Sequence, residues 1–229
     1  MDQQTFSKKE VIRFGWRTVK ENFLFFVGLL IIVLSIQVVL GQLSEFFKED
    51  VSPVFFILVV ISWLITFVIS LGLIYIALRF VDGVKPKYKD LLTPIEHFLS
   101  FSVASILYGI IVVVGLLLLV IPGIIWSIKY GLFRYLIVDK GMGPIEALKK
   151  SAEITKGSKW NLFLLAVLLG LINILGVLAF IVGLFVTIPL SMIAAAYVYR
   201  KLLFTAGEKV EGAEEKQNDS STDQASNPA

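Results

Sequence analysis

Two cationic side chains, Lys129 and Arg134, lie inside an apolar block of the sequence at residues 123–138. A cation in the hydrocarbon of a bilayer is costly, so it usually faces a partner or a cavity. The block contains no Asp or Glu, which excludes a lysine–carboxylate proton relay within it. We therefore predict a polar pocket for an anionic lipid headgroup or another anionic ligand. Its candidate residues are Lys129, Tyr130, Arg134 and Asn173.

Each cation also has a simpler explanation. Arg134 lies four residues from the inner end of the block, about 6 Å along a helix, so its guanidinium can snorkel to the interface. Lys129 lies about 9 Å from the outer end. If this short span thins the bilayer, the lysine reaches water and needs no ligand.

Other catalytic or metal-binding chemistry is scarce. The chain has no cysteine and one histidine, His97, which excludes disulfides, thiolate nucleophiles and multi-histidine metal sites. His97 follows Glu96 without a nucleophile or orienting group nearby, so we predict an interfacial surface side chain. No glycine-rich phosphate loop, metalloprotease helix motif or nucleophile elbow occurs. The sequence therefore predicts a non-enzymatic protein with no metal or cofactor.

The apolar residues are gathered in six blocks. Of the 229 residues, 57% are apolar and 17% charged, unlike a soluble domain. The blocks are residues 23–41, 53–79, 99–121, 123–138, 160–180 and 183–199, and none contains Asp or Glu. A bilayer span needs roughly 20 apolar residues, and its backbone must form its hydrogen bonds internally. We predict an all-α polytopic membrane protein with six transmembrane helices.

Proline and glycine separate the blocks. Ser52-Pro53 is typical of a helix start, with a capping serine and proline at the first helical position. Pro122-Gly123 divides a long apolar stretch, predicting a tight turn there and a continuous fourth helix after it. Gly183 predicts a similar turn between the last two spans.

The basic residues predict the orientation. With six spans both termini share one side, and that side receives 18 of the Lys and Arg residues outside the spans, whereas the other receives only Lys48. Lys and Arg are retained in cytoplasmic loops. We therefore predict a multi-pass protein of the cytoplasmic (inner) membrane, with both termini cytoplasmic.

A similar short sequence pattern precedes the first, third and fifth spans. Ser7, Thr93 and Gly143 are each followed three positions later by Glu, which is typical of a helix start. The architecture is thus three hairpins, each preceded by a short cytoplasmic interfacial helix. In the first of these helices, Val11, Ile12, Gly15, Trp16, Val19 and Phe23 share a face, and in the third Ile145, Leu148 and Ala152 do so. Opposite them lie the basic residues Lys9, Arg13, Arg17, Lys20, Lys149 and Lys150, which we expect to face anionic headgroups.

The C-terminal residues differ from the rest of the chain. From residue 206 onward the sequence is polar and acidic, so we predict a membrane domain at residues 1–205 and a disordered cytoplasmic tail at residues 206–229. The net charge of +3 follows the membrane topology, and it does not indicate nucleic-acid binding.

One stretch of the sequence has the pattern of a known family. Pro122-Gly123-Ile124, Val138-Asp139 and the segment from Gly143-Pro144-Ile145-Glu146-Ala147-Leu148 to Ser151 carry it. It resembles the membrane domain of bacterial glycerophosphoryl diester phosphodiesterases and related uncharacterised bacterial integral membrane families. The resemblance implies a bacterial six-helix membrane module. The phosphodiesterase activity itself belongs to a separate soluble barrel, for which this chain has no room.

Two functions are compatible with these features. The first is interaction with membrane lipids, such as anionic phospholipid, or with membrane protein partners, a second copy of the chain included. The alternative is a small transporter or channel component that uses a polar pocket around Lys129. Scattered intramembrane polar residues support transport, although helix-packing hydrogen bonds also explain them.

Overall fold

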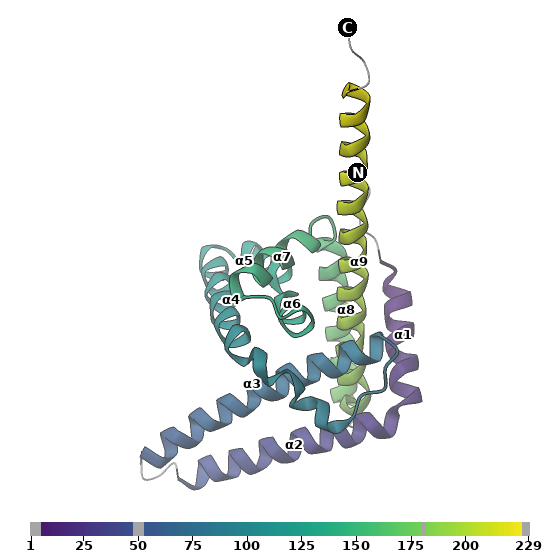
Figure 1. Cartoon of the computed structure of the whole chain (residues 1–229). Helices are drawn as coiled ribbons and strands as arrows, with labels where there is room; N and C mark the ends of the chain where they lie inside the picture. The colour runs from purple at the N-terminus through teal and green to yellow at the C-terminus, as the bar shows by residue number, and fades with distance from the viewer. Residues whose placement is uncertain (1–5, 48–52, 180–181, 226–229) are drawn as a thin grey trace.

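The computed structural model describes the backbone of residues 6–47, 53–179 and 182–225, and side chains up to Gly207. Every regular element in these ranges is a helix (Figure 1), which confirms the all-α prediction. The α-helices are α1 (Lys8–Glu21), α2 (Phe23–Phe46), α3 (Pro53–Val81), α4 (Phe98–Leu118), α5 (Val120–Tyr130), α6 (Phe133–Lys140), α7 (Pro144–Ile154), α8 (Lys159–Leu178) and α9 (Leu184–Ala225). Two short 3-10 helices, η1 (Tyr88–Leu91) and η2 (Thr93–His97), precede α4.

Within the described part of the chain, six helical segments are long and apolar enough to cross a membrane, as predicted. They are Phe23–Phe46, Pro53–Val81, Tyr88–Leu118, Val120–Lys140, Lys159–Leu178 and Leu184–Gly207. Large apolar side chains cover their outer faces; Leu24 and Leu117 are each 82% exposed. Water would penalise such a surface, whereas lipid would not. These segments are typical of a multi-pass membrane protein.

The spans form three consecutive units, and a shorter helical segment precedes each one. α1 precedes α2 and α3, η2 precedes α4 and α5–α6, and α7 precedes α8 and α9. Ser7 caps α1 by accepting the Glu10 N–H, and Pro144 occupies the first turn of α7. The middle segment is a 3-10 helix because Pro94 has a non-helical backbone (φ −84°, ψ 22°).

The turn between the third and fourth spans lies three residues before its predicted position. Leu119 is extended (φ −167°, ψ 148°) and divides α4 from α5, whereas Pro122 lies in the first turn of α5. An N–H there would have no partner within the helix, so proline costs little. Gly115 and Gly123 let α4 and α5 approach closely, because a Cβ on Gly115 would lie 2.9 Å from the Gly123 Cα.

The continuous fourth helix predicted for residues 123–138 is wrong. α5 ends at Tyr130 and α6 begins at Phe133, with Gly131 and Leu132 between them. Hydropathy does not detect this break, because residues 130–133 (Tyr-Gly-Leu-Phe) are all compatible with a span. Ser52 lies outside the described residues, so its predicted capping role stays a prediction.

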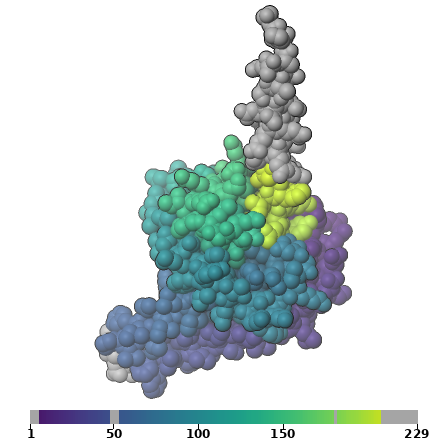
Figure 2. All heavy atoms as spheres, in the orientation of Figure 1, coloured from purple at the N-terminus to yellow at the C-terminus, as the bar shows by residue number. Residues whose placement is uncertain are grey.

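The core is built around α6, whose Phe133, Leu136 and Ile137 are completely buried. In Figure 1, α1 lies alongside α9, and α7 lies close to α5 and α6. The α2–α3 hairpin extends away from this packed body, as Figure 2 also shows. The network around Arg200 that is described below lies where α3, α6 and α9 meet.

α9 continues beyond its membrane-spanning part as a helix to Ala225, where the sequence predicts a disordered tail. Side chains after Gly207 lie outside the described residues. The division of the chain into a domain at residues 1–205 and a tail at residues 206–229 therefore stays a prediction.

Candidate functional site

The break between α5 and α6 is stabilised by two hydroxyl groups of α7. The Ser151 hydroxyl accepts the Leu132 N–H at 3.1 Å and donates to the Lys129 carbonyl at 3.0 Å. The Thr155 hydroxyl donates to the same carbonyl at 3.1 Å. Both side chains are fully buried. Backbone groups that leave a helix inside a membrane protein need such partners, so α7 supplies what the interrupted span lacks.

A cavity of about 380 Å³ lies beside this break. Its walls come from α3, α5, α6, α8 and α9, and most of them are apolar. The polar side chains at its wall are Ser127, Arg134 and Tyr135. Gly131 and Leu132 of the break also line it, so the interruption of the helix opens onto this space.

Arg134 is the cationic group of the cavity wall. Its guanidinium carbon lies 5.7 Å from the ring centroids of both Tyr108 and Phe133. Aromatic faces stabilise a cation but do not neutralise it. Among the described residues, no carboxylate lies within ion-pair distance of Arg134. The cavity thus has a positive charge available for an anion.

The other three candidate pocket residues lie apart from the cavity wall. The Lys129 ammonium lies 4.7 Å from the Tyr130 ring centroid, and neither side chain lines the cavity. The Asn173 amide donates to the Ser191 hydroxyl at 2.9 Å and so joins α8 to α9. In the described part of the chain, the Asn173 Oδ1 and Thr187 Oγ1 atoms are buried without hydrogen-bond partners. The structure therefore separates Asn173 from Arg134 instead of bringing all four residues together.

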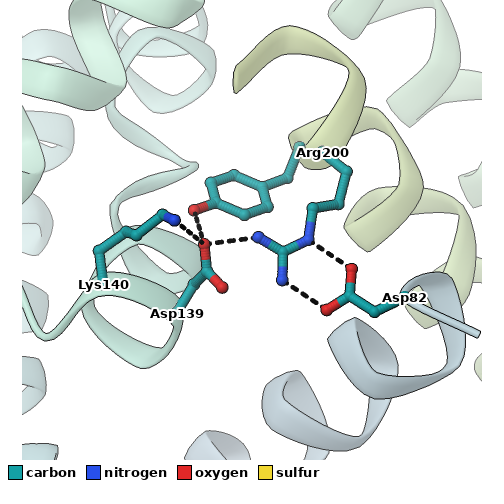
Figure 3. A network of polar contacts seen from close by, with 5 residues as sticks. Asp82, Asp139, Lys140 and Arg200 are labelled. Carbon is teal, nitrogen blue, oxygen red and sulfur yellow. Dashed lines mark hydrogen bonds and ion pairs between the residues drawn. The ribbon is translucent and has the colours of Figure 1, made fainter. Parts of the chain in front are cut away.

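A network of charged groups joins α9 to the ends of α3 and α6 (Figure 3). The Arg200 guanidinium donates to both carboxylate oxygens of Asp82, at 2.8 and 2.6 Å, and to Asp139 Oδ2 at 2.6 Å. The Tyr199 hydroxyl donates to the same Asp139 oxygen at 2.7 Å, and the Lys140 ammonium lies 3.8 Å from it. This network connects one span from each of the three units.

A second cluster joins α9 to α1. The Tyr197 hydroxyl donates to Glu10 Oε1 at 2.5 Å, and the Lys201 ammonium donates to both Glu10 oxygens at 2.9 and 3.0 Å. These hydrogen bonds, first from Tyr197 and then from Lys201, lower the pKa of Glu10 below its ordinary value of 4.5. Glu10 is therefore a stable carboxylate at neutral pH.

The apolar faces of α1 and α7 pack against protein. In α1, Val11, Gly15, Thr18 and Val19 are buried. Gly15 is needed for this contact, because a Cβ there would lie 3.2 Å from the Leu190 carbonyl oxygen of α9. In α7 the buried residues are Ala147, Leu148, Ser151 and Ile154.

The predicted lipid-facing stripes are therefore only partly in place. Trp16 is 53% exposed and Ile145 is 61% exposed, so they remain free to contact lipid, whereas Leu148 is in the core. Of the basic residues predicted to face headgroups, Arg17 lies 3.7 Å from Glu21 and Lys150 lies 3.0 Å from Glu153. Both pairs lie within one helix, so the predicted headgroup contacts of all six basic residues stay predictions.

The network around Arg200 was not among the predictions made from the sequence. A signal was present: Asp139 and Arg200 lie directly after apolar blocks, Asp82 lies three residues after one, and the two acids are opposite in charge to the arginine. A search for acids inside the blocks overlooks carboxylates at their ends. The hydroxyls of Ser151 and Thr155 gave no comparable signal, because an amphipathic helix carries such residues routinely.

No curated protein and no solved structure matches the chain. The family match gives no link to the glycerophosphoryl diester phosphodiesterases that the sequence motifs resemble. Over residues 105–206, from α4 to α9, the chain is similar to an uncharacterised family described as "Protein of unknown function (DUF975)".

Proposed function

We propose that this protein is a non-enzymatic membrane protein that binds an anionic phospholipid in the cavity beside the α5–α6 break. The observation that carries the proposal is Arg134, a cation at the wall of a largely apolar cavity with no carboxylate partner among the described side chains. A lipid phosphate would neutralise it, and the apolar walls would accept part of an acyl chain.

The chemistry of the cavity favours a lipid over a small polar ligand. Ser127 and Tyr135 offer hydrogen-bonding groups near Arg134, while leucines of α8 make up much of the opposite wall. A polar solute would leave those apolar groups uncompensated, whereas an amphiphile matches both parts of the wall. The other charged clusters are paired internally, which suits a structural role better than a catalytic one.

We further propose the cytoplasmic (inner) membrane of a bacterium as the location, with both termini cytoplasmic. The distribution of Lys and Arg outside the spans, 18 on one side against Lys48 on the other, supports this orientation. The resemblance of residues 122–151 to the membrane domain of bacterial glycerophosphoryl diester phosphodiesterases supports the bacterial origin.

Native mass spectrometry of the purified protein tests the lipid proposal. The protein is equilibrated with equal amounts of phosphatidylglycerol and phosphatidylethanolamine in mild detergent, and the retained lipid is identified. We expect selective retention of phosphatidylglycerol, weakened about tenfold in Arg134→Gln, because a charge-assisted contact of about 1.4 kcal/mol is lost.

Lys85→Gln is the control, because it removes an exposed cation between α3 and η1, outside the cavity. Lys129→Leu is compared in the same way and should have the smaller effect, since Lys129 does not line the cavity. Equal retention of phosphatidylglycerol by the parent, Arg134→Gln and Lys85→Gln would refute the proposal.

A second candidate function is transport, and the broken fourth span favours it. Transporters place binding sites at interrupted helices, where free backbone groups and half-helix ends face the ligand. Here, however, Ser151 and Thr155 already occupy the Lys129 carbonyl and the Leu132 N–H. Flux of an anionic solute into liposomes, abolished by Arg134→Gln, would favour transport over lipid binding.

A further inference from the structure

A groove of about 590 Å³ lies between α5 and α8. One wall is formed by isoleucines of α5 at helical spacing, Ile121, Ile124, Ile125 and Ile128. These residues share one face of the helix. The groove is thus an apolar channel along α5, about 10 Å long from the first isoleucine to the last.

The other wall of the groove carries a polar group at its end. Lys159, Trp160 and Phe163 line it, and the rings of Trp160 and Phe163 stack with centroids 5.4 Å apart. Lys159 is the first residue of α8, where the span begins. Within the described ranges Lys159 has no ion-pair partner. A cation and a tryptophan at the end of an apolar groove match the boundary between headgroup and acyl chain.

Ile128 belongs to both spaces. It lines the groove between α5 and α8 and also the cavity that contains Arg134. Ile128 is thus the side chain of α5 at which the groove and the cavity meet. A rotamer change of an isoleucine is a small movement, so the two spaces can be joined without unfolding α5.

We propose that the α5–α8 groove binds an acyl chain of an anionic phospholipid whose phosphate pairs with Lys159, and that it is the entrance to the Arg134 cavity. This inference rests on the proposed function for the cavity, and it adds a second binding position and a route past Ile128. The charge of Lys159 selects an anionic lipid over a zwitterionic one. The isoleucine wall selects an acyl chain over a soluble phosphate.

Trp160 provides a direct probe of the groove. The chain has four tryptophans, so Trp16→Phe, Trp63→Phe and Trp126→Phe together leave Trp160 as the only indole. This variant is placed in phosphatidylcholine vesicles with a minor fraction of phosphatidylglycerol, and bromine is carried on the acyl chains of one lipid or the other. Bromine quenches an indole only at short range, so quenching reports which lipid lies in the groove.

We expect brominated phosphatidylglycerol to quench Trp160 as if it were enriched about fivefold over its bulk fraction, because one lysine near an anionic surface supplies an attraction of that size. Lys159→Gln should reduce the enrichment to the bulk value. Lys85→Gln is the matched control and should keep it, because it removes an exposed lysine between α3 and η1, outside the groove. If brominated phosphatidylglycerol quenches Trp160 no more than its bulk fraction predicts while Lys159 is still present, the inference is overturned.

Ile128→Phe tests the route between the two spaces. A larger side chain at the shared wall should leave the quenching of Trp160 intact but reduce the phosphatidylglycerol that is retained through Arg134 in the mass spectrometry experiment. Unchanged retention would overturn the role of the groove as the entrance.

If the triple tryptophan substitution does not fold, retention by the otherwise unaltered protein and by its Lys159→Gln variant provides the same comparison.

The outcomes separate this inference from the proposed function. Lipid retention that is insensitive to Arg134→Gln, together with Lys159-dependent quenching, would overturn the cavity proposal and the entrance role while supporting the groove as a lipid site. Retention that depends on Arg134, together with unselective quenching of Trp160, would overturn the groove as an anionic lipid site and leave the cavity proposal standing.

Discussion

On one face of α9, Tyr197 and Lys201 bind Glu10 of α1, and on another, Tyr199 and Arg200 bind Asp139 of α6. Each cluster thus consists of a tyrosine hydroxyl and a cation donating to one carboxylate. The donor–acceptor distances are similar, between 2.5 and 3.0 Å. The chemistry of the two clusters is therefore nearly the same.

Their surroundings differ. The Glu10 and Lys201 side chains are 46% and 40% exposed, whereas those of Asp139 and Arg200 are 11% and 25% exposed. Exposed ion pairs contribute little to stability, but removing one member of a buried pair leaves a desolvated charge. The environment of these groups, more than their residue types, therefore decides how much each cluster stabilises the packing of α9.

The largest expected effect is that of Arg200→Met. It leaves Asp139 with little solvent and removes both contacts to Asp82, so we expect a loss of about 2–3 kcal/mol in the free energy of unfolding. Equilibrium unfolding in mixed SDS and maltoside micelles measures this quantity. Lys201→Met is the matched variant on the exposed side, and its loss should be much smaller. Equal losses of stability for the two variants would contradict the expected difference between the sheltered and the exposed cluster.

A smaller difference is expected for the tyrosines. Tyr199→Phe removes a donor to the sheltered Asp139 carboxylate, so it should lower the free energy of unfolding by about 1–2 kcal/mol. Tyr197→Phe removes the same hydroxyl from a carboxylate that water can solvate, and it keeps the ring contact with Phe14 at 4.6 Å. The same unfolding measurement should therefore show little change for Tyr197→Phe. A larger loss of stability for Tyr197→Phe than for Tyr199→Phe would instead show that the contact with α1 stabilises α9 more strongly.

The smallest expected effect is a pH dependence of the α1 contact. The pKa of Glu10 is lower in the folded protein than its ordinary value of 4.5, so the stabilisation is complete above that value. It is lost as the pH falls through the folded pKa. The difference in stability between the parent and Glu10→Gln should therefore shrink below pH 4.5. Unfolding measured from pH 7 downward follows it, and a difference that grows in acid would contradict this role of Glu10.

Hydropathy and charge predicted the fold because the cost of burying charge in lipid acts locally. Six acid-free blocks correspond to the six span candidates, and glycine at position 183 does precede α9. The turn between α4 and α5 lies at Leu119 and not at Pro122, where it was predicted. Proline is tolerated in the first turn of a helix as well as in the turn before it, so its position does not fix the boundary. Local rules therefore place helices well and their boundaries less well.

The candidate site was predicted less completely. Arg134 was identified, because a cation within an apolar block is unusual on sequence grounds alone. The grouping with Asn173 was not reproduced, since Asn173 binds Ser191 on α9. Equal depth in a membrane does not indicate which neighbouring helix a side chain meets.

The sequence by itself determined that six apolar segments are helical and that unpaired cations lie within the fourth. Only the tertiary structure decided that this fourth span is interrupted, that α7 supplies the missing hydrogen bonds, and that Arg200 connects Asp82 with Asp139. The reason is physical: hydrophobicity sorts residues between water and lipid according to their own composition. By contrast, a hydrogen bond between residues 61 positions apart, as between Arg200 and Asp139, depends on which helices pack together.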